Sequence, residues 1–331
     1  MEPYQQLEDE LGQWAGYPAE NVVACSSGTA ALHLALEAFR LPAGSEVILG
    51  DFNMIACPRA VSLAGLMPVF VDCDDRLLMD LDLVRPGVYD GAKTRNTSAV
   101  MAVHIYGRQI DMGRLHECAE PRGLAVIEDM AEIHGVRPHP RTDAACYSFF
   151  RNKIVAGEEG GAVLFRDPAA AALARMLRCQ GFTPEHDYRH IPRGHNYRLA
   201  NALAKPILES LAGYRLNVSI RRGIEWEYEK RCPPKWLMPD RQAVWVYDLR
   251  IPGLTWERQT AIVRALNEAG IAARHGFKPM HTQEEYKGCR AVGGENALKA
   301  SLEVLYLPAN PGITEADCRR AFDVLTEAVS N

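Results

Sequence analysis

Short apolar segments alternate with amphipathic ones through the first half of the chain. The apolar runs are too short for helices and predict strands at residues 21–25, 46–49, 67–71, 98–103, 124–127, 145–149 and 162–165. Between them apolar side chains recur at helical spacing, as Leu7, Leu11 and Trp14 do, which predicts helices at 3–15, 30–39, 55–64 and 111–122. This alternation predicts an α/β fold with a mainly parallel central sheet covered by helices on both faces.

The pattern changes after about residue 168. Helices are predicted at 168–178, 198–212 and 214–230, and Cys232-Pro233-Pro234 interrupts the chain. A strand at 243–251, a helix at 255–269, a strand-like stretch at 271–275 and a helix at 314–329 are expected beyond it. We therefore expect a large domain at residues 1–215 and a small C-terminal α+β domain at 216–331.

Length, composition and charge agree with two ordinary globular domains. The chain has 331 residues, of which 47% are hydrophobic. Lys and Arg number 37 against 42 Asp and Glu, a net charge of −5 that argues against a nucleic-acid or anionic-membrane binder. The acidic start MEPYQQLEDELGQW resembles neither a signal nor a transit peptide, and no apolar run is long enough to span a membrane. A cytoplasmic protein is expected.

The cysteines and histidines do not predict a metal site. Nine cysteines are scattered without a CxxC pair, which excludes zinc ribbons and thioredoxin-like motifs and favours small apolar residues in a reducing compartment. His186, His190 and His195 form a cluster by number, but their spacing carries no helix signature, and Pro184 and Pro192 interrupt it. We expect no bound metal.

Polar residues gather where the predicted strands end. Ser26-Ser27, Asp72, His104 and Asp129 each follow an apolar run. Ligands of open α/β sheets bind outside the carboxyl ends of the strands, so one pocket is expected to collect all four positions.

Three of the chain's motifs carry chemistry. Gly28-Thr29 opens a helix after a strand, where free N–H groups either receive a capping side chain or bind a phosphate. The carboxylates of Glu128-Asp129 close a strand and either cap the next helix or face a ligand. Lys153 lies between a buried strand and the Gly-rich stretch 157–161, where partial burial would lower its pKa and make it a nucleophile toward carbonyls.

A phosphate cradle, an aspartate and a lysine in this order are the parts that hold pyridoxal 5'-phosphate (PLP). The chain resembles the DegT/StrS-type nucleotide-sugar aminotransferases, a fold-type I PLP family. The resemblance rests on SSGTAALHLAL (26–36), PVFVDCD (68–74), AVHIYGRQIDM (102–112), VIEDMAEIHG (126–135), YSFFRNKIVAGEEGGAVLF (147–165), GHNYRLANALA (194–204) and LPANPGIT (307–314). The SFFxNK motif and Glu132 are most similar to the GDP-perosamine synthase branch, which aminates a GDP-linked 4-keto-6-deoxy sugar.

The resemblance implies roles for single residues. Lys153 would form the Schiff base and carry the proton of the 1,3-shift, Asp129 would pair with the pyridinium nitrogen, and Glu132 would lie near the 3-hydroxyl of PLP. The remaining cofactor contacts would come from Gly28, Thr29 and Ser148 at the phosphate, from Met54 and Asn152, and from Asn196 of a second subunit.

The resemblance also implies the substrates and partners. L-glutamate would donate the amino group, the nucleotide-linked sugar would accept it, and the active sites would be shared across a homodimer. His104, Tyr106 and His134 lie in matching segments, and they either contact the substrate or cofactor or serve as structural hydrogen-bonding groups. The charged stretch 215–231 is expected to be a solvated helix with paired charges.

The sequence departs from the family pattern at several places. Met54 stands where an aromatic residue usually stacks on the cofactor ring, and Glu158 replaces a glycine whose positive φ would be costly here. Family members usually have a further N-terminal segment before the helix at 3–15. These departures leave open another nucleotide sugar or a keto-cyclitol as the acceptor, and a non-catalytic PLP-fold binding or regulatory protein.

Overall fold

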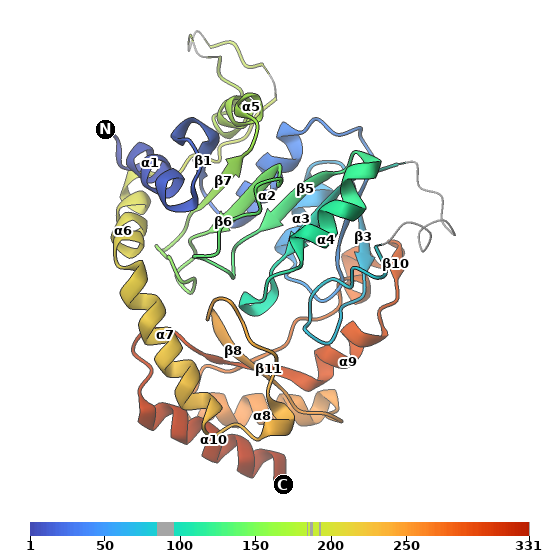
Figure 1. Cartoon of the computed structure of the whole chain (residues 1–331), viewed down its shortest axis with the longest axis vertical. Helices are drawn as coiled ribbons and strands as arrows, with labels where there is room; N and C mark the ends of the chain where they lie inside the picture. Colours follow the sequence, from blue (N-terminus) through green and yellow to red (C-terminus); the bar gives the residue numbers. More distant parts are fainter. Residues whose placement is uncertain (85–95, 184, 186–187, 192, 331) are drawn as a thin grey trace.

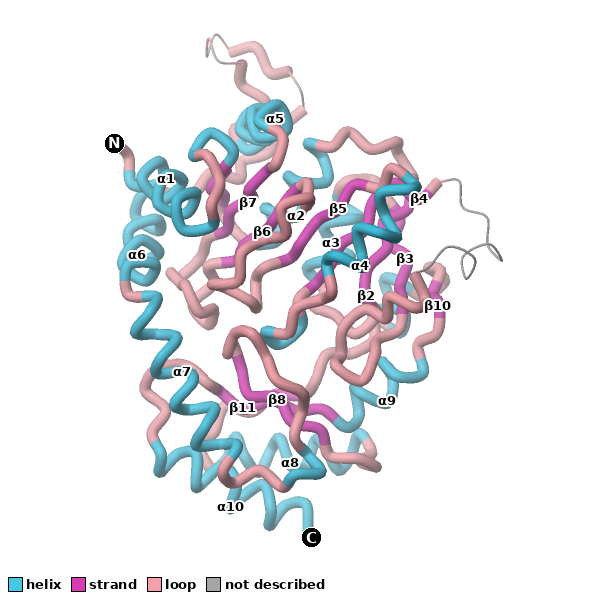
Figure 2. Tube along the Cα trace, viewed as in Figure 1, coloured by secondary structure: helices cyan, strands magenta, loops and turns pink. Residues whose placement is uncertain are grey.

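A computed structural model describes residues 1–84, 96–183, 185, 188–191 and 193–330 of the chain, which form two sheets of unequal size (Figure 1). The large sheet crosses the upper part of the view. Helix α7 descends from it to the small sheet, which lies above α8 and α10 at the bottom (Figures 1 and 2).

The large sheet has the order β1-β7-β6-β5-β4-β2-β3-β10. The pairs from β6 through β10 are parallel, whereas β7 pairs antiparallel with both β6 and β1. Its strands are β1 (Val22–Cys25), β2 (Glu46–Gly50), β3 (Met67–Val71), β4 (Thr97–Val103), β5 (Ala125–Asp129), β6 (Ala144–Ser148), β7 (Gly161–Phe165) and β10 (Ala291–Val292). The predicted fold class, a mainly parallel sheet between helices, is confirmed.

Helices cover the large sheet. Helix α2 packs on β6 and β7, and α4 packs on β4 and β5. The strands between them are almost wholly buried, which explains their continuous apolar runs. The helices of this part are α1 (Pro3–Ala15), α2 (Gly28–Ala38), α3 (Ala56–Leu63), α4 (Met112–Ala119), α5 (Pro168–Arg178) and α6 (Asn201–Ala212).

The small sheet has the order β8-β11-β9 and is antiparallel. Its strands are β8 (Val246–Arg250), β9 (Arg274–His275) and β11 (Val304–Pro308), and its helices are α7 (Tyr214–Glu229), α8 (Trp256–Glu268), α9 (Glu295–Glu303) and α10 (Glu315–Ser330). A second apolar core lies between this sheet and α7, α8 and α10, whereas Ala297 and Ala300 of α9 belong to the first core. The division at 215/216 stays a prediction, and β10 shows that the chain returns to the large sheet after it.

The predicted elements of residues 1–178 recur within a few residues of their expected bounds. Strands β10 and β11 and helix α9 were not predicted. The apolar run 304–308 directly follows a helix, and no turn residue separates the two. From the sequence alone, such a short apolar run can be either a strand or the end of the helix. Within the described residues no helix is long and apolar enough to cross a membrane.

Candidate active site

A cavity of about 310 Å³ opens at the carboxyl ends of β5 and β6, beside the N-terminus of α2. Asp129 ends β5, Ser148 ends β6, and Lys153 follows five residues later. The walls are completed by Ser27, Gly28, Thr29, Leu32, Met54, Ala56, Val103, Ala131, Glu132, Cys146, Tyr147, Phe150, Asn152, Glu159, Trp245, Phe277 and Tyr306. The three predicted chemical motifs therefore meet in one cavity.

The turn before α2 lies directly against β6. Ser27 caps the helix, and its side chain accepts a hydrogen bond from the Ala30 N–H at 3.1 Å. A Cβ atom on Gly28 would lie 2.6 Å from Cβ of Ser148, so only glycine fits. The first N–H groups of a helix have no intrahelical acceptor, and the first two residues of α2, Gly28 and Thr29, line the cavity together with Ser148. Capping of the helix by Ser27 and anion binding at the same turn are therefore compatible.

Lys153 is held in an apolar and acidic environment. Its Nζ lies 3.9 Å from the ring centroid of Trp245 and 3.9 Å from Oε1 of Glu132. Burial lowers the pKa of Lys153, although Glu132 and Asp129 oppose the shift. Burial and a lowered pKa are the properties expected of an amine that acts as a nucleophile toward carbonyls.

Asp129 is fixed from two sides. Its Oδ1 accepts the Ala131 N–H at 2.9 Å, and its Oδ2 accepts from Sγ of Cys57 at 3.2 Å. Burial raises the pKa of Cys57 well above its ordinary value, and Asp129 raises it further, so the thiol keeps its proton. The carboxylate is therefore oriented before any ligand arrives.

Glu132 faces Lys153 from the segment after β5. Its Oε2 accepts the Tyr106 N–H at 2.7 Å. Burial raises the pKa of Glu132 to about 7, against the opposing effect of Lys153. An acid and an amine whose pKa values are shifted toward neutrality are suited to proton transfer near pH 7.

An aromatic wall comes from the C-terminal part of the chain and was missed in the sequence. Trp245, Phe277 and Tyr306 line the cavity. The indole N–H of Trp245 donates to the Asn152 carbonyl at 3.0 Å and so ties this wall to the lysine loop. No motif marks these residues, because they reach the cavity only through the small sheet and its connections.

The expectation of a solvated helix at 215–231 was wrong for Arg221. This side chain is only 2% exposed. Its guanidinium donates to the carbonyls of Trp245 at 2.9 Å and Lys153 at 3.2 Å. A fixed planar donor set can serve several acceptors at once, so Arg221 fastens the lysine loop to the aromatic wall.

Two departures from the family pattern have a defined place. Met54 lines the cavity with 47% of its surface exposed, so its thioether is available to a ligand. Glu158 is not among the described residues with positive φ, whereas Gly160 has a φ of 148°. The positive-φ position is therefore still occupied by glycine, and the expected cost at Glu158 does not arise.

Asn196 lies outside this cavity. It lines a separate hollow with Arg178 and Arg198, and its Oδ1 accepts from the Arg198 guanidinium at 3.2 Å. Asn196 was expected to contact the cofactor of a second subunit, not of its own. The structure describes one chain, so this contact stays a prediction.

His104 and Asp72 do not join the pocket expected at the strand ends. His104 is fully buried, with Nε2 3.0 Å from Glu128 and Nδ1 accepting the Ile110 N–H. Asp72 accepts the N–H groups of Asn296 and Ala297 and so caps α9. Both polar groups therefore bind partners within the protein. The sequence pattern did not reveal these partners, which is why both residues were expected in the pocket.

Tyr106 and His134 lie behind the cavity wall. Tyr106 packs against Phe277 with 5.0 Å between ring centroids. Nδ1 of His134 accepts the Val155 N–H at 3.0 Å, and burial lowers the pKa of His134 to about 3, so this ring is neutral. Neither residue lines the cavity, and both support residues that do.

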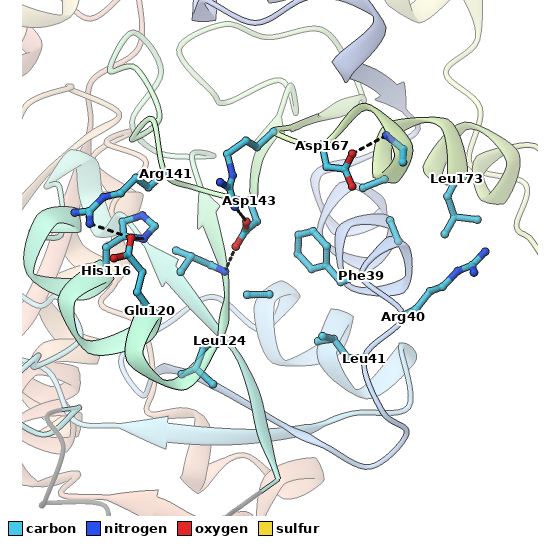
Figure 3. Close-up of a pocket in the computed structure, with 17 residues that line it drawn as sticks. Phe39, Arg40, Leu41, His116, Glu120, Leu124, Arg141, Asp143, Asp167 and Leu173 are labelled. Carbon is cyan, nitrogen blue, oxygen red and sulfur yellow. Dashed lines mark hydrogen bonds and ion pairs between the residues drawn. The ribbon is translucent and has the colours of Figure 1, made fainter.

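A larger hollow of about 910 Å³ lies at the opposite end of β5 (Figure 3). Arg141 is paired with Glu120 at 2.9 Å, and Asp143 is paired with Arg166 and the Val126 N–H. These charges neutralise one another and no nucleophile stands among them. The smaller cavity, with its buried lysine, is therefore the candidate active site.

The cavity fits PLP by its donor set. Its helix N-terminus and Ser148 hydroxyl suit a phosphate, Asp129 suits a protonated ring nitrogen, and Lys153 suits an aldehyde carbon.

Comparison with known families agrees with this site. The model of the DegT/DnrJ/EryC1/StrS aminotransferase family matches residues 2–326. The chain is 33% identical to the GDP-perosamine synthase of Caulobacter vibrioides over 98% of this chain and 89% of that protein. It is 32% identical to the UDP-N-acetyl-3-dehydro-alpha-D-glucosamine 3-aminotransferase of Acidithiobacillus ferrooxidans, over 96% of this chain and 86% of that one.

Solved structures give the same result. The crystal structure of S. venezuelae DesV superposes with a TM-score of 0.86 at 29% identity, covering 99% of this chain and 90% of that chain. The resemblance stated from the sequence motifs is therefore confirmed over the whole fold.

Proposed function

The chain belongs to the DegT/DnrJ/EryC1/StrS aminotransferase family and is a PLP-dependent enzyme, and from this premise we propose that it aminates a nucleotide-linked 4-keto-6-deoxy sugar with L-glutamate as donor. The amino group of glutamate is exchanged for the keto oxygen of the sugar, and glutamate leaves as 2-oxoglutarate. The similarity to a GDP-perosamine synthase over 98% of the chain supports this choice of acceptor.

The observation that carries the proposal is the meeting of Lys153, Asp129 and the phosphate-type turn in one cavity. When bound, PLP supplies an electron sink for the charge left on a substrate carbon that loses its proton. The N–H groups of Gly28 and Thr29 and the Ser148 hydroxyl would hold its phosphate. The Asp129 carboxylate would keep a proton on its ring nitrogen.

Lys153 carries the proton in both half-reactions. Its lowered pKa enlarges the share of neutral amine that can accept a proton at Nζ, and Glu132, 3.9 Å away, stabilises the ammonium that results. The Trp245 ring lies across Nζ and limits its approach to one side. These residues orient the amine, exclude water and move one proton between two carbons.

The test begins with the lysine. After reduction with borohydride, mass spectrometry is expected to find a pyridoxyl group on Lys153. Lys153→Ala is expected to lose transamination while keeping the wild-type circular dichroism spectrum. Lys153→Ala that still transaminates, or label on another lysine, would overturn the assignment.

The acceptor is tested separately with GDP-, UDP- and dTDP-linked 4-keto-6-deoxy sugars. Turnover of the GDP-linked ketone with glutamate is the expected result. Relatives at 28–32% identity are named for dTDP- and UDP-linked sugars, so another nucleotide is the second candidate. Turnover only of a cyclitol ketone would refute the sugar-nucleotide proposal, and absence of any half-reaction with glutamate would point to a non-catalytic protein.

We further propose that two copies of the chain share the active sites, with Asn196 of one copy reaching the cofactor phosphate of the other. The surface position of Asn196, outside its own cavity, supports this. Mixing Lys153→Ala with Asn196→Ala chains is expected to restore activity in heterodimers, because one of their two sites is intact. A monomer with full activity would refute the proposal.

A further inference from the structure

A second cluster of ligand-type side chains lies behind the phosphate turn. His33 and Glu37 are one turn apart on α2, and His195 reaches them from the segment before α6. Residues at i and i+4 lie on the same helix face. From this arrangement we propose that His33, Glu37 and His195 bind one divalent transition-metal ion, zinc by preference.

The distances suit one small ion. The ligand atoms of all three residues lie within 4.8 Å of one another. Nε2 of His33 is 3.6 Å from Oε1 of Glu37, and Nε2 of His195 is 2.7 Å from Oε2 of Glu37. Ligand atoms of a tetrahedral zinc site stand about 3.3 Å apart, given bonds of about 2.0–2.1 Å. The two distances involve different oxygens of Glu37, and for one ion to contact all three residues the first has to close by about 0.3 Å and the second to open by about 0.6 Å.

His33 supplies the independent observation. Its side chain is only 2% exposed, and its buried Nε2 makes no hydrogen bond of ordinary geometry with any described residue. Nδ1 lies 3.2 Å from the Tyr197 hydroxyl. A proton on Nδ1, donated to Tyr197, leaves the lone pair on Nε2 directed toward Glu37. An unpaired buried nitrogen is costly, and a metal bond would satisfy it.

The two imidazoles share one neighbour, Tyr197, whose hydroxyl lies 3.2 Å from Nδ1 of His33. Tyr197 also stacks on His195 with 4.8 Å between ring centroids, so one aromatic side chain orients both histidines.

An ion pair between His195 and Glu37 explains part of the geometry without a metal. It accounts for the 2.7 Å contact but leaves Nε2 of His33 unsatisfied. The set of two imidazoles and one carboxylate, with room for water as a fourth ligand, is typical of zinc. Glu37 and His195 are 24% and 26% exposed, which gives the ion a path from solvent.

The site connects the two parts that the proposed function assigns to the phosphate. Helix α2 starts at the phosphate turn, and the Ser26 N–H donates to the Tyr197 carbonyl at 2.8 Å. Asn196 lies between His195 and Tyr197. A metal would fasten this segment to α2 and fix where Asn196 is presented. The metal binding itself does not depend on the proposed function, whereas this consequence does.

The experiment uses the untagged full-length chain, stripped with a chelator and free of PLP. Titration with Zn²⁺ in a calorimeter is expected to show one ion per chain, and Co²⁺ is expected to show the absorption of a tetrahedral site. Zn²⁺ is expected to raise the melting temperature, because a ligand that binds the native state stabilises it. No activity measurement enters, so failure here is distinct from failure of the proposed function.

Variants locate the ion. His33→Gln and His195→Gln are expected to weaken Zn²⁺ binding by at least about tenfold and to abolish the rise in melting temperature. His190→Gln is the matched control, because the His190 ring is exposed and its contacts, the Gln180 carbonyl at 2.9 Å and the Phe182 ring at 4.3 Å between centroids, are not residues of the proposed site. If His33→Gln does not fold, Glu37→Gln takes its place. Absence of stoichiometric binding, or binding lost in His190→Gln but kept in the other variants, would overturn the proposal.

Discussion

Gly28→Ala tests how closely the phosphate turn is packed against the sheet. The added Cβ would lie 2.6 Å from Cβ of Ser148, 3.1 Å from its Oγ and 3.2 Å from its Cα. Ordinary van der Waals contact begins at 3.4 Å, so the turn and β6 must separate by about 0.8 Å. Ser148 ends a strand that is paired on both sides, and Ser27 already caps α2, so neither element moves freely.

The structure sets the size of the effect. Overpacking of a well-packed region costs about 1–3 kcal/mol. A displacement of about 1 Å in a group that positions a reacting molecule can cost about 100-fold in rate. We therefore expect Gly28→Ala to lower the free energy of unfolding by about 1–3 kcal/mol and to weaken PLP binding well beyond that of a control variant.

The assay is a double-mutant cycle with Ser148→Gly. Urea unfolding of the PLP-free protein measures stability, and fluorescence titration measures PLP affinity. Because Ser148→Gly removes the atom that clashes, the double variant is expected to recover most of the stability lost by Gly28→Ala. It should not recover full PLP affinity, since the hydroxyl that we assign to the phosphate is gone.

Gly223→Ala is the control for the amino-acid change itself. An added Cβ at this position in α7 meets open space. Alanine is the better helix former by about 0.5–1 kcal/mol, so this variant is expected to be more stable and to bind PLP normally. The reasoning would be refuted if Gly28→Ala matched wild type in stability and PLP affinity, or if Ser148→Gly did not relieve its cost.

Three further predictions use other contacts of the structure. Met54→Phe places an aromatic side chain where the family usually has one and is expected to tighten PLP binding by about 2–10-fold. This corresponds to the value of an aromatic pair, about 0.5–1.5 kcal/mol. The same fluorescence titration measures it, and weaker binding would contradict the prediction. The buried guanidinium groups of Arg108 and Arg241 lie 2.9 Å and 3.0 Å from the Asp248 carboxylate. Asp248→Asn removes the negative charge that both share, so the free energy of unfolding in urea should fall by about 3–5 kcal/mol. An unchanged unfolding midpoint would refute this prediction. His134 has its pKa lowered from 6.5 to about 3, so the native state binds fewer protons than the unfolded state in that range, and stability is expected to fall as pH drops from about 6.5 toward 3. His134→Asn removes this contribution, and its unfolding free energy should change with pH less steeply than wild type, by up to about 1.4 kcal/mol per pH unit; equal slopes would contradict the assignment.

Much of the candidate site could be predicted because it is local in sequence. Gly28-Thr29, Asp129 and Lys153 each lie within a few residues of a strand end, and parallel strands present their carboxyl ends at one edge of the sheet. The order of strands and helices was enough to bring these residues together. Glu132 and Ser148 were implied by the family resemblance of the motifs that contain them.

The incorrect predictions concern polar residues whose partners lie far away in the sequence. His104 and Asp72 stand at strand ends like Asp129, yet Glu128 occupies one and the N-terminus of α9 occupies the other. A polar residue at a strand end is free for a ligand only if no distant group needs it. The hydrophobic pattern of one segment does not show which polar group of a distant segment will bind its side chains.

The sequence by itself determined the alternation of strands and helices in the large sheet, the family, and the residues of the three chemical motifs, because each is encoded in hydrophobic periodicity or in a short stretch of chain. Only the tertiary structure decided what surrounds them. The buried Arg221 lies on α7, the helix that leaves the large sheet, and the Trp245 wall comes from beyond that helix. The cluster of His33, Glu37 and His195 joins residues far apart in the sequence, with 158 positions separating Glu37 and His195, while His190 is not part of the cluster and His186 lies outside the described residues. Contacts of this kind depend on how the elements pack in space, and no periodicity along the chain specifies them.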